Sequence, residues 1–259
     1  MNPVLILTRN NLALTKRCVE SVRQQDVLAD LLVLDNGSTD GTRQWLDQIG
    51  MGIYRHPSNN DGVSKGWNDG LDHFFGFLKA PHCLVIGNDT VLPPDFYRTL
   101  LSVNLPFVTG VAVDNMEQAM QTPEILPLMP NPDFSAFLIR RAAWEIIGPF
   151  DEGMKHYSSD QDYHIRGWRL GVPMMKASVP FYHERSSTIR NASPEERAEI
   201  EAQANKDRQY LRQKWGVSAG GPDYEALFTP ELFGYERTRT SRSVPAQVPH
   251  DSISETRKE

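Results

Sequence analysis

Two aspartates in this sequence follow apolar runs, a position from which carboxylates can bind a ligand. Asp35 ends the run 31–34, and the glycines Gly37 and Gly41 then permit a tight turn before a helical pattern opens. Open α/β sheets bind ligands at this carboxyl edge, and a carboxylate there can accept hydrogen bonds from a base or a ribose. Asp35 is therefore a candidate nucleoside-binding residue.

Asp89 is placed similarly, three residues after the apolar run 83–86 and directly after Asn88. A divalent cation bound to a diphosphate needs one or two protein oxygens, because phosphate and water fill the other positions. Asp89 suits that role, although a turn aspartate that caps the helix after Pro93 would look the same. His183 also follows an apolar run and has two interpretations, a metal or diphosphate ligand and a structural histidine.

Asp160 and Asp162 stand at a helix start, which the capping-box spacing of Ser158 and Gln161 predicts. Arg166 is one turn beyond Asp162, so this pair is expected to support the helix and the site around it. Asp160 lies at the helix tip, where a carboxylate can face a cleft and take a proton from an attacking hydroxyl group. The alternative is an acidic residue favoured there by the helix dipole alone.

Lys65 lies in a helix opening rich in asparagine and glycine, residues 59–68. Such openings suit anions, because backbone N–H groups and the helix dipole favour negative charge. Lys65 is therefore a candidate phosphate ligand, with a solvated lysine on a capped helix as the alternative.

The elements that must position these residues alternate along the chain. Apolar runs predict strands at 4–7, 31–34, 52–54, 83–86 and 107–113, and helical spacing predicts helices that include 62–78 and 141–147. This alternation predicts an α/β fold with a mostly parallel central sheet flanked by helices. The segment 114–132 has no clear period and is predicted to be a long surface loop.

The C-terminal part of the chain differs in composition. Ser193, Pro194 and Glu196 predict a capping box and a proline at the first position of a polar helix that ends near Gly216. Residues 1–216 are predicted to form one domain, with residues 217–259 as a C-terminal extension. After about residue 234 the extension has no hydrophobic period, which predicts disorder.

Composition excludes several classes of protein. The chain has 259 residues, 39% of them hydrophobic, and a net charge of −6, so it is no generic binder of polyanions. Cys18 and Cys83 lie in apolar segments and are expected to be buried free thiols. No run approaches the roughly 20 apolar residues of a membrane helix, and the N-terminus lacks the basic region of a signal peptide. A cytoplasmic location is expected.

Taken together over residues 3–190, the order and spacing of these motifs resemble the family 2 glycosyltransferases of the GT-A fold, most closely their rhamnosyltransferase-like branch. The resemblance rests on the segments 4–10, 34–42, 60–68, 87–90, 147–152, 160–166 and 182–183. It implies the GT-A fold and transfer of a sugar, a hexose or deoxyhexose, from a nucleoside diphosphate.

The resemblance also implies roles for individual residues. Six match donor-binding motifs, the first three at positions that hold the nucleoside: Thr8, Arg9, Asp35, Asn36, Lys65 and Asn88. Asp89 matches the metal-binding carboxylate of the Asp-x-Asp element, His183 a histidine near the metal and diphosphate, and Asp160 the catalytic base of the Glu-Asp element. Gly87 replaces the first acid of Asp-x-Asp, and Ser159 replaces the glutamate of Glu-Asp.

The predicted activity is therefore an inverting glycosyl transfer that uses Mn²⁺ or Mg²⁺ and a UDP- or dTDP-linked donor. A glycan or lipid-linked glycan is the expected acceptor, the latter requiring peripheral docking at a membrane, and a modified nucleic acid is the lesser alternative. A nucleotidyltransferase should carry a glycine-rich phosphate loop, which residues 8–11 lack. A noncatalytic sugar-nucleotide or glycan-binding module is the other rival, favoured by Gly87 and Ser159.

Overall fold

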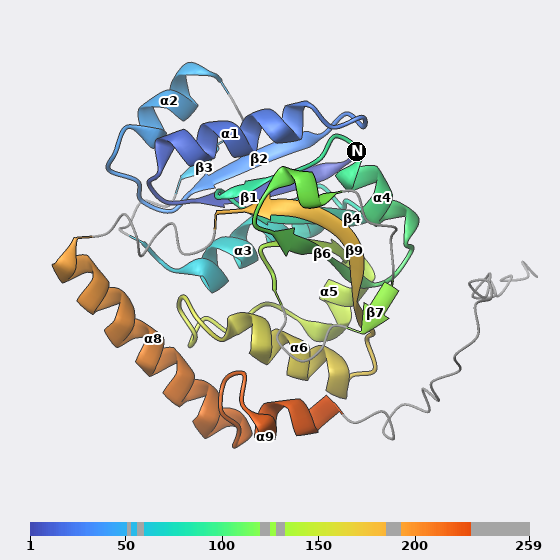
Figure 1. Cartoon of the computed structure of the whole chain (residues 1–259), viewed down its shortest axis with the longest axis vertical. Helices are drawn as coiled ribbons and strands as arrows, with labels where there is room; N and C mark the ends of the chain where they lie inside the picture. Colours follow the sequence, from blue (N-terminus) through green and yellow to red (C-terminus); the bar gives the residue numbers. More distant parts are fainter. Residues whose placement is uncertain (51–52, 56–59, 120–124, 128–132, 185–192, 229–259) are drawn as a thin grey trace, which may run out of the picture. The chain divides into compact units, whose positions relative to one another are not determined.

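Short apolar runs form the strands of one sheet in the computed structural model, which describes residues 1–50, 53–55, 60–119, 125–127, 133–184 and 193–228 (Figure 1). Within these residues the strands are β1 (Pro3–Thr8), β2 (Asp30–Asp35), β3 (Ile53–Arg55), β4 (His82–Gly87), β5 (Thr90–Val91), β6 (Phe107–Val113), β7 (Ile125–Pro127), β8 (Ala136–Arg140) and β9 (Met174–His183). Their order is β3-β2-β1-β4-β8-β6-β9-β5, with β7 paired to β9. Every run predicted as a strand overlaps one of them.

The sheet is mostly parallel, as predicted. β1, β2, β3, β4, β6 and β9 run in one direction, whereas β5, β7 and β8 run in the opposite one. Thr8 pairs with Asp35, and Leu7 pairs with Gly87. The carboxyl ends of β1, β2 and β4 therefore lie side by side.

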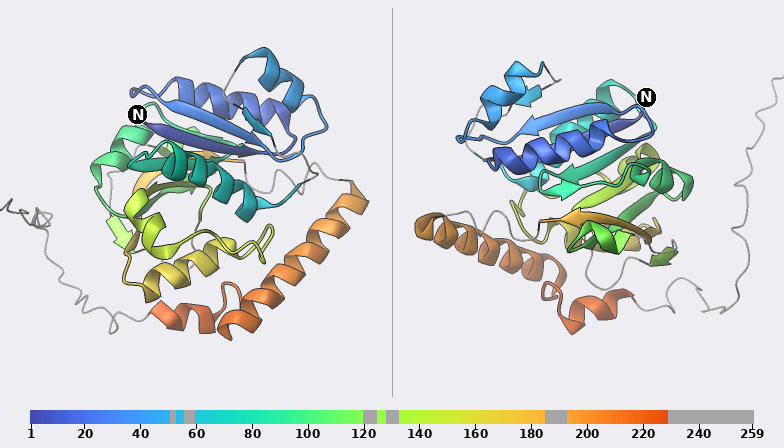
Figure 2. Two further views of the ribbon diagram at one scale, coloured as in Figure 1. Left: turned by 180° about the vertical axis from the view of Figure 1, so that it is seen from behind. Right: turned by 45° about the horizontal axis from the view of Figure 1, so that its top comes forward.

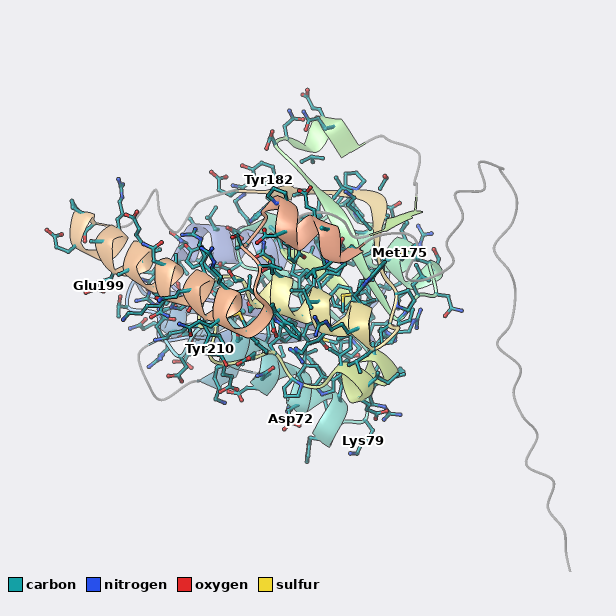
Figure 3. All side chains as sticks on the ribbon, turned by 90° about the horizontal axis from the view of Figure 1, so that it is seen from below. Asp72, Lys79, Met175, Tyr182, Glu199 and Tyr210 are labelled. Carbon is teal, nitrogen blue, oxygen red and sulfur yellow. The ribbon has the colours of Figure 1, made fainter. Side chains whose placement is uncertain are left out.

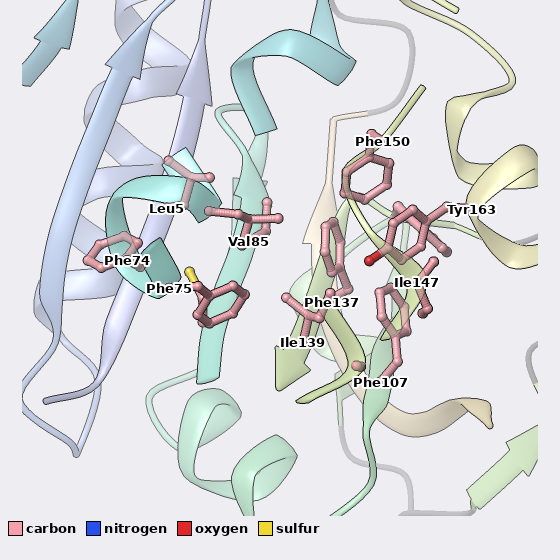
Figure 4. Close-up of a cluster of buried hydrophobic side chains, with 14 of the residues drawn as sticks. Leu5, Phe74, Phe75, Val85, Phe107, Phe137, Ile139, Ile147, Phe150 and Tyr163 are labelled. Carbon is pink, nitrogen blue, oxygen red and sulfur yellow. The ribbon is translucent and has the colours of Figure 1, made fainter. Parts of the chain in front are cut away.

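Helices cover both faces of the sheet (Figure 2). They are α1 (Leu12–Arg23), α2 (Thr42–Gln48), α3 (Val63–Leu71), α4 (Phe96–Ser102), α5 (Arg141–Ile147), α6 (Ser159–Arg169), α8 (Pro194–Trp215) and α9 (Pro222–Glu225), with the turns η1 (Asp72–Phe77), η2 (Met116–Ala119) and η3 (Ala226–Phe228). Side chains alternate along β4, so Val85 packs with α3, η1, α5 and α6, whereas Ile86 packs with α1, α2 and α4. Aromatic rings such as Phe137, Phe150 and Tyr163 fill the first of these cores (Figure 4).

One predicted helix is not regular along its whole length. The α-helix of residues 62–78 ends at Leu71, and η1 continues it as a π-helix, in which Leu78 N donates to the carbonyl of His73. The wider turn rotates the last residues away from the core, because each turn contains an additional residue. Phe74 and Phe75 stay buried, but Leu78, which regular helical spacing would place on the same face, is 37% exposed.

Two further predictions were wrong. The segment 114–132 was expected to be a loop, yet it contains η2 and β7, which adds a strand to the sheet. Residues 120–124 and 128–132 of that segment lie outside the described part. Ser158 does not form the expected capping box: it has a φ of 63°, and its side chain makes no capping hydrogen bond. A capping residue usually has an extended backbone, and the left-handed backbone of Ser158 departs from that geometry.

The C-terminal helix α8 begins as predicted. Ser193 and Glu196 form a capping box, and Pro194 occupies the first turn. After α8, the side chains of Tyr224 and Phe228 pack with Ile165 of α6. These residues belong to a compact unit that ends at Phe228. The predicted disordered tail after about residue 234 lies outside the described residues, so the domain boundaries stay predictions.

Candidate active site

A cleft of about 1230 Å³ opens at the carboxyl ends of β1 and β4. Its wall contains seven residues that the sequence predicts for the site: Thr8, Arg9, Asn36, Asn88, Asp89, Asp160 and His183. Residues 155–161, which include the start of α6, and residues of α8 between Glu196 and Arg208 supply other parts of the wall. Residues that lie far apart in the sequence therefore share one cleft.

A hydrogen-bond network fixes the loop after β1. The side-chain amide of Asn88 donates to Thr8 Oγ1 at 3.0 Å, to the carbonyl of Asn10 at 3.1 Å and to Thr15 Oγ1 at 3.0 Å. The hydroxyls of Thr8 and Thr15 are 2.8 Å apart. Asn10 has a φ of 58°, a left-handed conformation that asparagine tolerates. Thr8 and Asn88 thus shape this part of the cleft by holding the backbone around it.

Asp35 and Asn36 have different surroundings at the end of β2. Asp35 is fully buried, and its carboxylate accepts hydrogen bonds from Ser38 N and Arg43 Nε, both at 3.0 Å. Asn36 reaches the cleft wall, and its amide binds the backbone of residues 61–62 at 3.0 and 3.1 Å. Asp35 therefore holds the loop after β2, and its predicted contact with a nucleoside stays a prediction.

The pairing of β5 with β9 brings Asp89 and His183 together. Thr90 lies opposite His183 in this antiparallel pair, and Glu184 N donates to the carbonyl of Asp89 at 2.9 Å. His183 Nε2 lies 3.4 Å from Asp89 Oδ2, and the two side chains are 16% and 17% exposed. Only the tertiary structure makes this contact, since the two residues are remote in the sequence.

Gly87 affects the same carboxylate. A Cβ atom at position 87 would lie 2.9 Å from Asp89 Oδ1, so the glycine leaves the space into which this carboxylate folds. Asp89 and His183 offer one oxygen ligand and one imidazole nitrogen, a donor set that suits a divalent cation completed by phosphate and water. The described residues contain no group of three or more acidic, histidine or cysteine side chains that could hold a metal ion. A cation at Asp89 and His183 would therefore need phosphate or water ligands as well.

Asp160 lies in the first turn of α6 and lines the cleft. Its Oδ1 accepts a hydrogen bond from Gln161 N at 2.9 Å. Burial raises the pKa of Asp160 from 3.8 to about 6; the Gln161 N–H lowers it, and the charge of Asp133 raises it further. Asp133 is held in turn by a hydrogen bond from Ser135 N at 2.9 Å. A carboxylate with this pKa is ionised at pH 7 and more basic than usual, which suits proton removal.

Asp162 is buried within the structure instead. Its Oδ2 accepts a hydrogen bond from Arg166 Nε at 2.8 Å, which confirms the predicted pair. Its Oδ1 accepts from Trp215 Nε1 at 2.8 Å and lies 2.7 Å from Lys214 Nζ. Asp162 therefore ties the C-terminal end of α8 to α6.

Like Asp35 and Asp162, two more predicted residues lie outside the cleft wall. Lys65 forms an ion pair with Asp69 one turn later on α3. Arg166 lines a different hollow of about 720 Å³, which it shares with Trp144, Asp151 and other residues. The anion-binding role of Lys65 stays a prediction that the position of its side chain does not support.

Several cleft residues were not predicted from the sequence. They include Asp133, Lys155, His156, Tyr157, Lys176 and Arg208. Burial, and then the charge of Lys155, lower the pKa of His156 to about 4, so its imidazole is neutral at pH 7. Asp207, which raises that pKa, lies on α8 and also had no sequence motif. Nothing in the local sequence marks these residues, because they meet only through the fold.

Three comparisons place the chain among known proteins. Residues 4–114 match the family model described as Glycosyl transferase family 2. No curated protein sequence matches the chain. Among solved structures, S. aureus TarS matches 84% of this chain at 16% identity, with a TM-score of 0.55, and the matched part is 44% of the TarS chain.

Two other structures match at similar levels. Glucosyl-3-phosphoglycerate synthase from Mycobacterium tuberculosis, solved with Mn²⁺, UDP and glucosyl-3-phosphoglycerate, has a TM-score of 0.57 and 17% identity over 84% of this chain and 80% of its own. Mannosyltransferase PcManGT from Pyrobaculum calidifontis, solved with GDP-Man and Mn²⁺, has a TM-score of 0.52 and 15% identity over 87% and 73%. These likenesses show a shared GT-A fold.

Proposed function

Because residues 4–114 match glycosyl transferase family 2, we propose that this chain moves a sugar from a nucleoside diphosphate donor to an acceptor hydroxyl group with inversion of configuration. One observation carries the proposal: the cleft brings Asp89, His183 and Asp160 together from the ends of β4 and β9 and the start of α6. A metal and diphosphate ligand set and a basic carboxylate therefore face the same space.

The donor is proposed to lie against the ends of β1, β2 and β4, with UDP or dTDP as its nucleotide. Structures of S. aureus TarS contain UDP-GlcNAc or UDP, and the M. tuberculosis synthase contains UDP. Arg9 and Asn36 line this side of the cleft and can contact the nucleotide. The rhamnosyltransferase-like branch and the sugar itself remain predictions from the sequence.

Asp89 and His183 are the residues that would hold Mn²⁺ or Mg²⁺. When bound, such an ion neutralises the charge that develops on a diphosphate leaving group. The open cleft beside the Asp89–His183 pair leaves room for the phosphate oxygens that must complete the ligand set.

Asp160 is proposed to act as the general base. Its carboxylate takes the proton of the acceptor hydroxyl while that oxygen bonds to the anomeric carbon and the bond from this carbon to the diphosphate breaks. A single displacement of this kind inverts the anomeric configuration. The raised pKa of Asp160 fits the role, because a stronger base removes the proton more readily.

The acceptor is proposed to enter between Asp160 and α8, where Glu196, Glu199 and Gln203 line the cleft. These side chains can form hydrogen bonds with the hydroxyl groups of a glycan or lipid-linked glycan. Two glutamates disfavour a nucleic acid, the lesser alternative, by charge repulsion. Each described helix is too short or too polar to span a bilayer.

A thermal-shift panel tests the donor and the metal together. UDP-glucose, UDP-N-acetylglucosamine, GDP-mannose and dTDP-rhamnose are each added with Mn²⁺, with Mg²⁺ or with EDTA, and the best ligand is then titrated by calorimetry. We expect one donor to raise Tm only when metal is present, and to be hydrolysed slowly. The absence of binding to every nucleotide would contradict the proposal.

A noncatalytic binding module is the second candidate, because Gly87 and Ser159 replace acidic residues of the family motifs. The same experiment distinguishes it from the enzyme. Tight binding of a sugar nucleotide without hydrolysis, and without transfer to any glycan in an acceptor panel, would support the module.

A further inference from the structure

The C-terminal helix α8 holds the loop that precedes Asp160 through one buried carboxylate. Asp207 is fully buried, and its side chain accepts hydrogen bonds from the backbone N–H groups of Lys155 at 3.1 Å, His156 at 2.8 Å and Tyr157 at 2.9 Å. Gln203 Nε2 donates to the same carboxylate at 2.7 Å. Three consecutive N–H groups bound to one carboxylate fix the backbone direction of that loop.

The opposite side of the loop is held by the start of α3. Val63 N donates to the carbonyl of Lys155 at 2.6 Å, and Ser64 Oγ donates to the carbonyl of Met154. A Cβ atom at Gly62 would lie 2.4 Å from the Lys155 carbonyl, so the two segments are in close contact. The loop 154–157 is therefore bound by Asp207 and by the start of α3. Asn36, on the donor side of the cleft, binds the neighbouring residues 61–62.

A second attachment of α8 lies on the other side of Asp160 in the sequence. Trp215 and Lys214 bind the carboxylate of Asp162, as described above. Figure 3 shows α8 running from Glu199, at its distal part, past Tyr210 toward α6. The helix α8 thus contacts residues 155–157, which precede Asp160, through Asp207. It contacts Asp162, two residues after Asp160, through Trp215 and Lys214.

Asp160 depends on this backbone for its position. Among the described residues, the neighbouring Gln161 N–H donates a hydrogen bond to its carboxylate. No side chain of the described residues hydrogen-bonds it. The direction of the first turn of α6 therefore decides where the carboxylate points.

We propose that Asp207 is a positioning residue for Asp160: it orients the first turn of α6 by fixing residues 155–157. The inference rests on the proposed role of Asp160 as the base. Asp207→Asn tests it, because an amide keeps one acceptor oxygen and turns an NH₂ group toward backbone N–H donors. Leu211→Ala is the matched control, since Leu211 is fully buried one turn later on the same helix and is apolar.

Hydrogen exchange and UDP titration in the presence of Mn²⁺ are measured on the full chain. We expect Asp207→Asn to speed amide exchange in residues 155–163 at least tenfold while the Kd for UDP changes less than twofold. With the best donor of the thermal-shift panel, kcat for hydrolysis should fall at least tenfold with KM nearly unchanged, and Asp207→Glu should restore part of it. Leu211→Ala should lower Tm but leave kcat and exchange in this segment near the wild-type values.

Two results would overturn the inference. One is unchanged exchange in residues 155–163 of Asp207→Asn; the other is an equal fall of kcat in Leu211→Ala, which would mean that any loss of stability in α8 has the same effect. If the wild-type protein hydrolyses none of the sugar nucleotides, the proposed function fails instead. The exchange data then still decide whether Asp207 orients the first turn of α6.

Discussion

The two sides of the cleft are built differently. The donor side consists of the ends of β1, β2 and β4, where the parallel register brings the segments 8–11 and 87–89 together and the side chain of Asn88 joins them. The acceptor side combines Asp133, residues 155–161 and α8; Asp207 joins α8 to residues 155–157, and Asp162 joins α6 to the end of α8. Strand ends thus place the residues of one side, whereas the other side depends on contacts that α8 makes with segments remote from it in the sequence.

This difference separates two kinds of functional residue. On the donor side, a residue after an apolar run reaches the cleft because its strand ends there. On the acceptor side, a residue reaches the cleft only if a remote element supports it. Substitutions on the donor side should therefore change binding, whereas those on the acceptor side should change the chemical step.

The largest effect is expected for Asp160→Asn, on the acceptor side. Transfer should fall by about 10²–10⁴-fold, the usual contribution of a positioned general base, because the amide cannot take a proton. The Kd for UDP with Mn²⁺ should stay nearly unchanged. If Asp160→Asn turns over at nearly the wild-type rate while Asp162→Asn is folded but inactive, then Asp162 is the base and Asp160 is not.

On the donor side, Asp89→Ala should weaken UDP binding in the presence of Mn²⁺ by about 10–100-fold, since a phosphate-bound cation loses its carboxylate ligand. Binding measured by calorimetry in EDTA should be the same for the variant and the wild type. Asp95→Ala, an exposed aspartate at the start of α4, is the control and should have no effect. Full activity of the wild-type protein in EDTA would rule out the metal role.

The pH profile examines Asp160 without a substitution. Only the carboxylate form accepts a proton, so with a pKa of about 6 the rate should rise about tenfold from pH 5 to pH 7 and then level off. The raised pKa also means that the folded protein binds more protons than the unfolded one between pH 4 and 6, so this group lowers stability as pH rises through that window. Asp160→Asn should accordingly stabilise the protein more at pH 7 than at pH 4. The gain in the free energy of unfolding, variant minus wild type, should be about 1–3 kcal/mol larger at pH 7. A rate that is flat from pH 5 to 7 would contradict the assignment.

Asp35→Ala should raise the Kd for UDP about tenfold if the carboxylate binds the nucleoside, because a hydrogen bond to a charged group contributes about 1.5–3 kcal/mol. Arg43→Ala is the matched variant, since it removes the partner of Asp35 and leaves the carboxylate in place. Equal weakening in both variants would show that Asp35 acts through the shape of the loop. Unchanged titration of UDP and dTDP by Asp35→Ala would exclude both roles.

The smallest effect is expected at the start of α8. Ser193→Ala removes the capping box, so amide exchange in residues 194–200 should accelerate several-fold. Because Ser193 and the first turn of α8 are exposed, Tm and turnover should change little. A fall in kcat would show that the distal part of α8 also supports the catalytic step, which would extend the comparison between the two sides.

Much of the fold follows from local sequence. Apolar runs end where β1, β2, β4 and β6 end, because a strand buried on both faces needs continuous apolar residues and stops where polar ones begin. The segment 114–132 and the π-helical end of the helix after Gly62 were missed, since β7 exists only through its pairing with β9 and a π-turn leaves the apolar pattern of a helix unchanged.

The sequence by itself determined the types of the site residues and the strand ends on which Asp35 and Asp89 stand. It also identified Asp160 at a helix start, although the capping box that suggested this start does not form. The family resemblance assigned His183 to the metal site of Asp89, but only the tertiary structure gave the contact between them and placed Asp207 at the loop before Asp160. The physical reason is range: a strand end or a helix cap depends on neighbouring residues, whereas these contacts join segments whose approach the whole packed sheet decides.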